Sequence, residues 1–181
     1  MLVRLGFDSD IYSPEVAALL AHKAGGAARP MELFPSRCTD ESVRSQLLKA
    51  DAVALFPNAR DANAALSGLF LYFSCLKEAH ELVDNASHAD GMYWHAIMHR
   101  MEGDGGNSGY WFRHVGRHPV FPALAQEARE LGYEKGGDWD PFAFIRYCEM
   151  SARTKEDDLA KRVQLAEWQL LFRHCAGMAA H

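Results

Sequence analysis

The sequence lacks the long apolar runs and the basic excess that would assign it to a membrane or nucleic-acid class. Its most apolar stretch, residues 64–76, is too short for a membrane-spanning helix, which needs about 20 residues. The formal net charge of -5 disfavours a nucleic-acid-binding surface, because such surfaces are basic overall, and gives no reason to expect a membrane surface. The first ten residues show no basic start followed by an apolar run, so we expect no secretory signal.

Cysteine is scarce and irregularly spaced. The four cysteines form no Cys-x-x-Cys pair, which disfavours both a thiolate zinc site and a disulfide scaffold. Cys75, Cys148 and Cys175 lie in apolar helical patterns, so we expect them to be small core residues. Reduced thiols fit a cytoplasmic protein, and we predict that location.

Several catalytic signatures are also missing. The chain has no Gly-x-Ser-x-Gly elbow and no Gly-Lys-Ser/Thr of a nucleotide-binding loop. The hypothesis of a small hydrolase or lyase is therefore supported by one pair of residues only, in which Glu102 would orient His99 as a general base.

Helix signals, by contrast, are abundant. A chain of 181 residues that is 49% hydrophobic can bury its own core, and we expect one domain over residues 1–181. Ser13-Pro14 and Asp140-Pro141 combine a capping side chain with proline at the first helical position. Strand-like alternation appears only at residues 2–7, and it is weak. We predict an all-α, compact bundle of roughly six to eight helices.

Hydrophobic periodicity and capping residues place these helices along the chain. The longest is expected over residues 58–84, because its apolar residues follow one helical face. Two loosely similar segments about 30 residues apart favour an arrangement in helical hairpins. The other helices are expected over residues 14–22, 40–56, 88–102, 108–115, 122–131, 141–150 and 154–175.

Histidine and carboxylate side chains concentrate on the helix expected over residues 88–102. The residues that share one face of it are His88, His95, His99 and Glu102. Two imidazoles four residues apart can converge on one ion, and a carboxylate one turn further can supply an oxygen. We predict a site for a divalent transition metal (iron, zinc or manganese) at His95, His99 and Glu102. The alternative is a structural hydrogen-bond network of the same groups.

The segment that follows is rich in glycine, arginine and aromatic residues. Glycines before a helix N-terminus can expose backbone N–H groups to an anion, and a guanidinium can hold a carboxylate in a bidentate pair. We therefore predict a small anionic partner, with a tight structural turn as the alternative. The expected ligand-binding residues are Arg100, Asn107, Tyr110, Trp111, Arg113 and His118. In the last helix, Gln164 and Glu167 are expected at a solvent-facing rim.

The central segment also resembles a known family. His95 to Asp104, followed by Asn107, Tyr110 to Arg113 and Gly116 to Phe121, is similar to a segment of small helical proteins from bacteria and fungi with no assigned activity. The similarity extends over roughly residues 60–175. It implies one helical domain with a special central segment, and it implies no reaction.

These observations predict a small-ligand-binding protein with a His/Glu/Arg pocket between helices that also holds a metal. The alternative is a non-enzymatic helical scaffold or interaction module, in which the same cluster is purely structural.

Overall fold

A computed structural model describes residues 12–22, 28, 31–134 and 136–177, and within these residues every regular element is a helix. The weak strand-like alternation at residues 2–7 lies outside the described residues. The ten helices are α1 (Pro14–Ala21), α2 (Glu41–Leu47), α3 (Ala52–Leu55), α4 (Ala62–Tyr72), α5 (Leu76–Val83), α6 (Ala89–Met101), α7 (Gly105–Val115), α8 (Phe121–Leu131), α9 (Pro141–Ser151) and α10 (Asp157–Cys175). The all-α prediction is confirmed, and the expected count of six to eight was too low.

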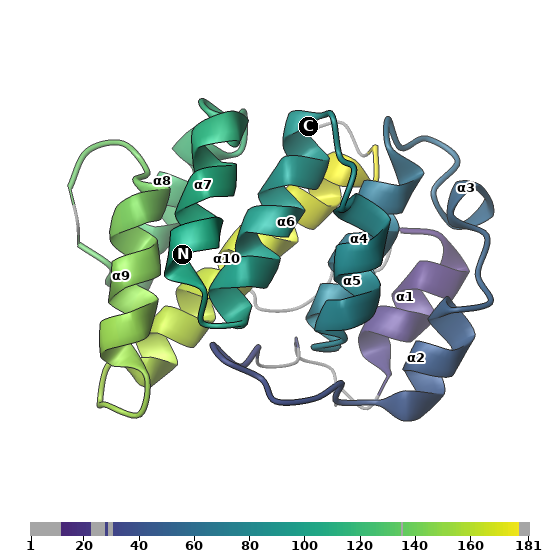
Figure 1. Cartoon of the computed structure of the whole chain (residues 1–181), viewed down its shortest axis with the longest axis horizontal. Coiled ribbons are helices and arrows are strands. Elements are labelled where there is room, and N and C mark those ends of the chain that lie inside the picture. The colour runs from purple at the N-terminus through teal and green to yellow at the C-terminus, as the bar shows by residue number, and fades with distance from the viewer. Residues whose placement is uncertain (1–11, 23–27, 29–30, 135, 178–181) are drawn as a thin grey trace.

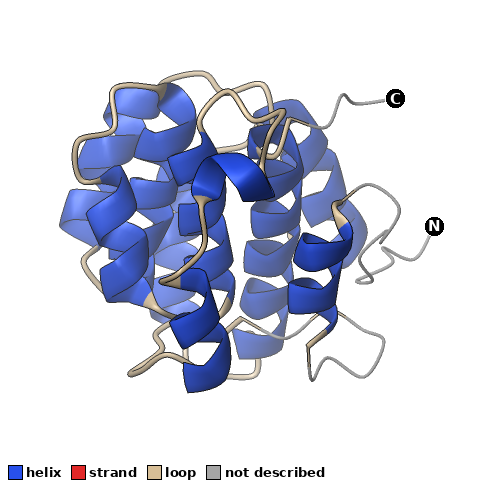
Figure 2. Ribbon diagram, turned by 90° about the vertical axis from the view of Figure 1, so that its right-hand side faces the viewer, coloured by secondary structure: helices blue, strands red, loops and turns tan. Residues whose placement is uncertain are grey.

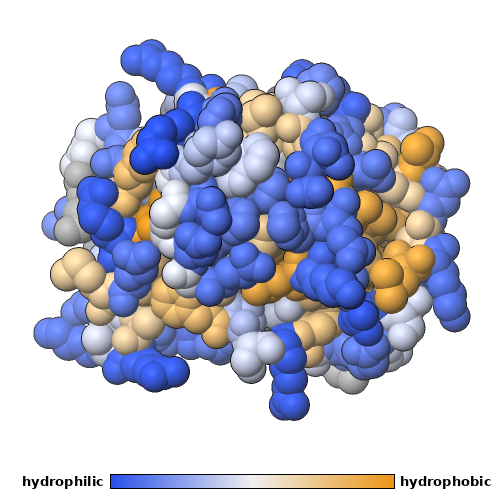
Figure 3. Space-filling model, viewed as in Figure 1, coloured by the Kyte–Doolittle hydropathy of each residue, from blue (hydrophilic) through white to orange (hydrophobic). Residues whose placement is uncertain are grey.

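The helices α4 to α7 stand side by side with α9 beyond α7, and α10 crosses behind them (Figures 1 and 2). Packing between consecutive helices is closest for α4 with α5 and for α6 with α7. The buried apolar side chains form one connected cluster, and the face seen in Figure 3 is mostly hydrophilic with scattered apolar patches. No helix in the described residues is both long and apolar enough to cross a bilayer.

The centre of the bundle depends on one close approach between helices. A Cβ at Gly68 would lie 2.7 Å from Cζ2 of Trp94, so α4 and α6 meet where only glycine fits without a shift. The indole nitrogen of Trp168 in α10 donates a hydrogen bond of 2.7 Å to the Gly68 carbonyl. Three helices are thus held together at one residue.

Several predicted helix boundaries are confirmed by their caps. Ser13 accepts a hydrogen bond from the Val16 N–H, and Asp140 accepts from the N–H groups of Phe142 and Ala143. The helix predicted over residues 88–102 is α6, and Gly132 ends α8 in the left-handed conformation. The first helix ends at Ala21, and its predicted terminators Gly25 and Gly26 lie outside the described residues.

Two predicted helices are each divided in the structure. Asp51 caps a separate short helix α3, which divides the segment expected over residues 40–56. The segment predicted over residues 58–84 breaks between α4 and α5, where Ser74 has φ of 60°. The N–H and hydroxyl of Thr39 both donate to the Phe73 carbonyl, so tertiary contacts satisfy the backbone at this break.

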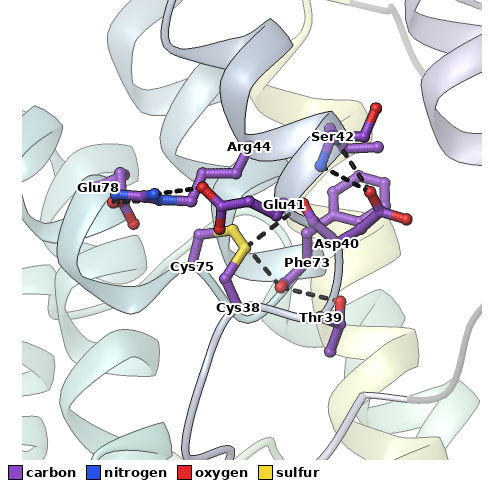
Figure 4. Close-up of a disulfide and its surroundings, with 10 residues drawn as sticks. Cys38, Thr39, Asp40, Glu41, Ser42, Arg44, Phe73, Cys75 and Glu78 are labelled. Atoms are coloured by element: carbon purple, nitrogen blue, oxygen red, sulfur yellow. Dashed lines mark hydrogen bonds and ion pairs between the residues drawn. A yellow bond between two sulfur atoms is a disulfide. The ribbon is translucent and has the colours of Figure 1, made fainter.

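A disulfide joins Cys38 to Cys75, which corrects the expectation of reduced thiols and of Cys75 as a free core residue (Figure 4). The bond ties the loop before α2 to the N-terminus of α5. Beside it, Arg44 of α2 forms an ion pair of 2.6 Å with Glu78 of α5. Irregular spacing in the sequence concealed this pair, because its sulfurs are brought together only by the turn after α4. Cys148 and Cys175 are free and buried, as expected.

Candidate metal centre

Three imidazoles meet where α5 packs against α6. His95 and His99 lie one turn apart on α6, and His80 comes from α5. One ring nitrogen of each residue lies within 4.8 Å of those of the other two. The structure therefore brings together the two histidines that the sequence predicted, and adds a third that it did not.

The three rings are packed face to edge and face to face. The ring centroid of His80 is 4.6 Å from that of His95 and 5.5 Å from that of His99. His95 and His99 stack at 4.9 Å, and the indole of Trp111 stacks on His95 at 4.0 Å. Trp111, which was predicted to bind a ligand, is thus a wall of the histidine cluster.

His95 is the innermost of the three, with 2% of its surface exposed. Its Nδ1 atom is buried and has no hydrogen-bond partner in the described part of the chain. Burial, together with the neighbouring His80 and His99, lowers the pKa of His95 to about 4, against a weaker opposite effect of Asp84 and the Val83 carbonyl. The ring is therefore neutral near pH 7, with a lone pair available to a metal ion.

Glu102 lies behind His99 instead of beside the other imidazoles. Its Oε2 atom is 3.0 Å from Nδ1 of His99, so the carboxylate accepts a hydrogen bond from Nδ1 and favours the neutral tautomer whose lone pair is on Nε2. The sequence predicted Glu102 as a direct metal ligand. In the structure, the side chains that could share one ion are His95, His99 and, in place of Glu102, His80. A carboxylate in this position orients a metal-binding histidine and raises its basicity.

His80 is the outermost of the three, with 37% of its side chain exposed. Its Nε2 atom is 3.6 Å from Oδ1 of Asp84, one turn further along α5. The cluster is thus buried on the α6 side and open at α5, which provides a path from solvent.

A second cluster of similar composition has a different hydrogen-bond arrangement. Asp90 at the start of α6 lies 2.9 Å from Nε2 of His118 and 3.2 Å from Nε2 of His174. Burial would raise the pKa of Asp90, but the hydrogen bond from His118 and the charge of His174 outweigh it, and the pKa is lowered. The Val120 N–H donates to Nδ1 of His118, so the proton sits on Nε2 and points to Asp90. Both ring nitrogens of His118 are engaged, one as acceptor and one as donor, which marks this cluster as a hydrogen-bond network.

Arg100, predicted as a ligand-binding cation, is buried in the protein interior. It pairs with Glu167 of α10, and both side chains are almost fully buried, at 1% and 0% exposure. The Tyr93 hydroxyl donates to Glu167 at 2.9 Å, and Arg100 also donates to Gln164 at 3.3 Å. Gln164 and Glu167 therefore lie in the core, which corrects their expected position at a solvent-facing rim.

The glycine-rich segment does not form an open anion cradle. Helix α7 begins at Gly105, and Asp104 caps it by accepting a hydrogen bond from the Asn107 N–H. Asn107 also donates through its side chain to Asp104, at 2.7 Å. The helix N-terminus is thus occupied by the chain's own carboxylate.

The remaining predicted ligand residues separate from the histidine cluster. Tyr110 is 49% exposed and lies against Trp111 and His114. Arg113 is exposed, with its guanidinium 6.0 Å from the ring centre of Phe142. Arg113 and the buried His118 both line a cleft between α7, α8 and α9.

No family model matches the chain, and no curated protein and no solved structure matches it either. The resemblance of the central segment to a family of helical proteins stays a prediction.

Proposed function

We propose that this protein binds one divalent transition-metal ion through His80, His95 and His99. Neutral imidazole is a common ligand of zinc, iron and related metals. Two of the three donors are fixed on successive turns of one helix, and the third enters from the neighbouring helix. Zinc is the first choice, because three histidines with a water or substrate in a fourth position form a known zinc arrangement.

The observation that carries the proposal is the buried Nδ1 atom of His95 without a partner. The large majority of buried side-chain polar atoms in proteins have a hydrogen-bond partner, so a ligand for this nitrogen would restore the usual pattern. A metal ion bound by the three rings would hold all of them in one arrangement.

The surroundings support the same assignment. Glu102 lies 3.0 Å from Nδ1 of His99, and a carboxylate at this distance from a metal-binding histidine fixes the orientation of its ring. Two nitrogens bound to one zinc lie about 3.3 Å apart, from zinc–nitrogen distances of about 2.0–2.1 Å. The observed limit of 4.8 Å requires only small ring movements to reach that spacing. The open position beside half-exposed His80 is where a water or a small substrate would bind.

Calorimetric titration of zinc into protein prepared without a histidine tag and stripped with EDTA tests the proposal. We expect about one equivalent bound, and loss of binding in His80→Ala, His95→Ala and His99→Ala. Glu102→Gln should weaken binding by roughly 10- to 100-fold, as loss of an outer-shell carboxylate does. The matched control is His88→Ala, which removes an exposed imidazole at the start of α6 and should bind as wild type does.

Two outcomes would overturn the proposal. One is folded wild-type protein that takes up no zinc, iron or manganese. The other is unchanged metal affinity in all three histidine variants. If His95→Ala and His99→Ala lower stability while wild type binds no metal, the cluster is a structural network instead.

A further inference from the structure

A cleft of about 650 Å³ lies between the C-terminal end of α7, the start of α8 and the start of α9. This volume is within the range of small-molecule sites. The cleft is separate in its residues from the histidine cluster, since His80, His95 and His99 do not line it. Much of its lining is aromatic, from Phe112, Phe121, Trp139 and Phe142.

Two guanidinium groups of the cleft have no acidic partner among the described residues. Arg113 and Arg117 both line it and both are exposed, and neither forms an ion pair within the described ranges. By contrast, Arg44 and Arg100 are paired with carboxylates. Adjacent cations beside an apolar wall match a ligand that has a carboxylate at one end and an apolar body.

The lining also contains acids, and their positions determine where a carboxylate would lie. Asp140 is engaged as the cap of α9, where it accepts hydrogen bonds of 2.9 and 3.1 Å from two backbone N–H groups. Asp138 is exposed on the same loop and would repel an anion placed near it. A ligand carboxylate is therefore favoured at the α7 wall, next to the two arginines, with the apolar body toward the aromatic side chains.

Trp139, on the loop before α9, is part of the aromatic lining of the cleft. Trp139 is 7% exposed, and its indole nitrogen is buried without a hydrogen-bond partner in the described residues. His118, also in the lining, has both ring nitrogens engaged within the protein, because its Nδ1 accepts a hydrogen bond from the Val120 N–H and its Nε2 donates to Asp90.

From these observations we infer that the cleft is a binding site for a small aromatic carboxylate, held by Arg113 and Arg117 and stacked among the aromatic residues. This site is independent of the proposed metal centre. Binding can therefore be measured on EDTA-treated protein, so that a carboxylate bound to a metal ion is not mistaken for it.

Indole-3-propionate is a suitable probe, and tryptamine, which has an amine in place of the acid, is its counterpart. Calorimetry should show saturable binding of indole-3-propionate and at least tenfold weaker binding of tryptamine. Arg113→Gln/Arg117→Gln should lose roughly 10- to 100-fold in affinity, the range for charge-assisted contacts. Both arginines are exposed, so this variant should fold. Arg146→Gln, at an exposed arginine of α9 outside the cleft, is the matched control and should bind normally.

A second measurement locates the ligand. In ¹⁵N-correlated NMR spectra, the indole N–H signal absent from Trp139→Phe should be the one that shifts on titration with indole-3-propionate. The inference is overturned if wild type does not bind the acid at millimolar concentration. It is equally overturned if the double arginine variant binds indole-3-propionate as tightly as wild type does, or if wild type binds tryptamine as tightly as indole-3-propionate. A shifted indole signal that belongs to another tryptophan would overturn it as well.

Discussion

At the residue scale, the environment of His95 makes its protonation costly. The ring is buried, stacked between other aromatic groups and close to two further histidines. An unfolded histidine titrates near pH 6.5, whereas the pKa of His95 in the folded chain is about 4. Protons therefore bind preferentially to the unfolded chain between these two values.

We predict that metal-free protein loses stability as the pH falls from 6.5 toward 4. The contribution of His95 is fully present above pH 6.5, and about 2 kcal/mol of it should be lost between pH 7 and pH 5. Urea unfolding of the EDTA-treated protein across this range measures the effect. His95→Gln is the control, because any pH dependence of the unfolding free energy that this variant lacks must come from the titration of His95. Equal pH slopes in wild type and variant would contradict the prediction.

The sequence predicted part of the histidine cluster and missed the rest for a physical reason. The spacing of His95 and His99 is a local property of one helix, so it could be read directly. His80 lies fifteen positions earlier, and nothing in the sequence states that α5 packs against that face of α6. The one available signal was the position of His80 on a short amphipathic segment. A single histidine in such a segment is common and does not by itself indicate a metal ligand.

At the scale of elements, the pair of α4 and α5 shows where periodicity misleads. Apolar residues keep a helical spacing through residues 66–82, yet the chain turns at Phe73 to Cys75. The turn depends on Thr39 and Cys38, residues more than 30 positions away, which hold its backbone and its sulfur. Long-range contacts of this kind leave no local pattern, whereas capping residues such as Asp140 do.

We expect the Cys38–Cys75 bond to stabilise the fold by about 2–4 kcal/mol, because it closes a loop of moderate length in the unfolded chain. Urea unfolding with and without a phosphine reductant measures this difference. The double variant Cys38→Ser/Cys75→Ser should have the same unfolding free energy with and without the reductant. Thiol titration of the denatured, unreduced protein should count two thiols, from Cys148 and Cys175, and a count of four would contradict the bond.

At the scale of the whole molecule, the buried pair of Arg100 and Glu167 links α6 to α10 across 67 positions of sequence. Arg100 also lies over the ring of Phe144 at 4.7 Å, so this α6 side chain contacts two other helices, α9 and α10. The all-α class followed from capping and composition alone. This central ion pair did not, because charged residues are expected at the surface.

Removal of either partner should be strongly destabilising. We predict a loss of about 3–5 kcal/mol for Glu167→Gln, because Arg100 is then left as an unpaired buried charge. The double variant Arg100→Met/Glu167→Met should recover much of that loss. Urea unfolding of the single and double variants measures the coupling, with Lys77→Gln as an exposed ion-pair control. A double variant that is destabilised by the full sum of the single effects would refute the coupling.

The helix that carries His80 is also the helix that begins at a cross-linked cysteine. Since one ligand of the proposed metal centre is positioned by a covalent tether, the metal content of a sample should follow its redox history. In protein prepared with a strong reductant, the disulfide no longer restrains α5 and His80. This protein should therefore retain less zinc than protein prepared in air. Preparations of one polypeptide would then differ in composition, although their amino-acid sequence is identical.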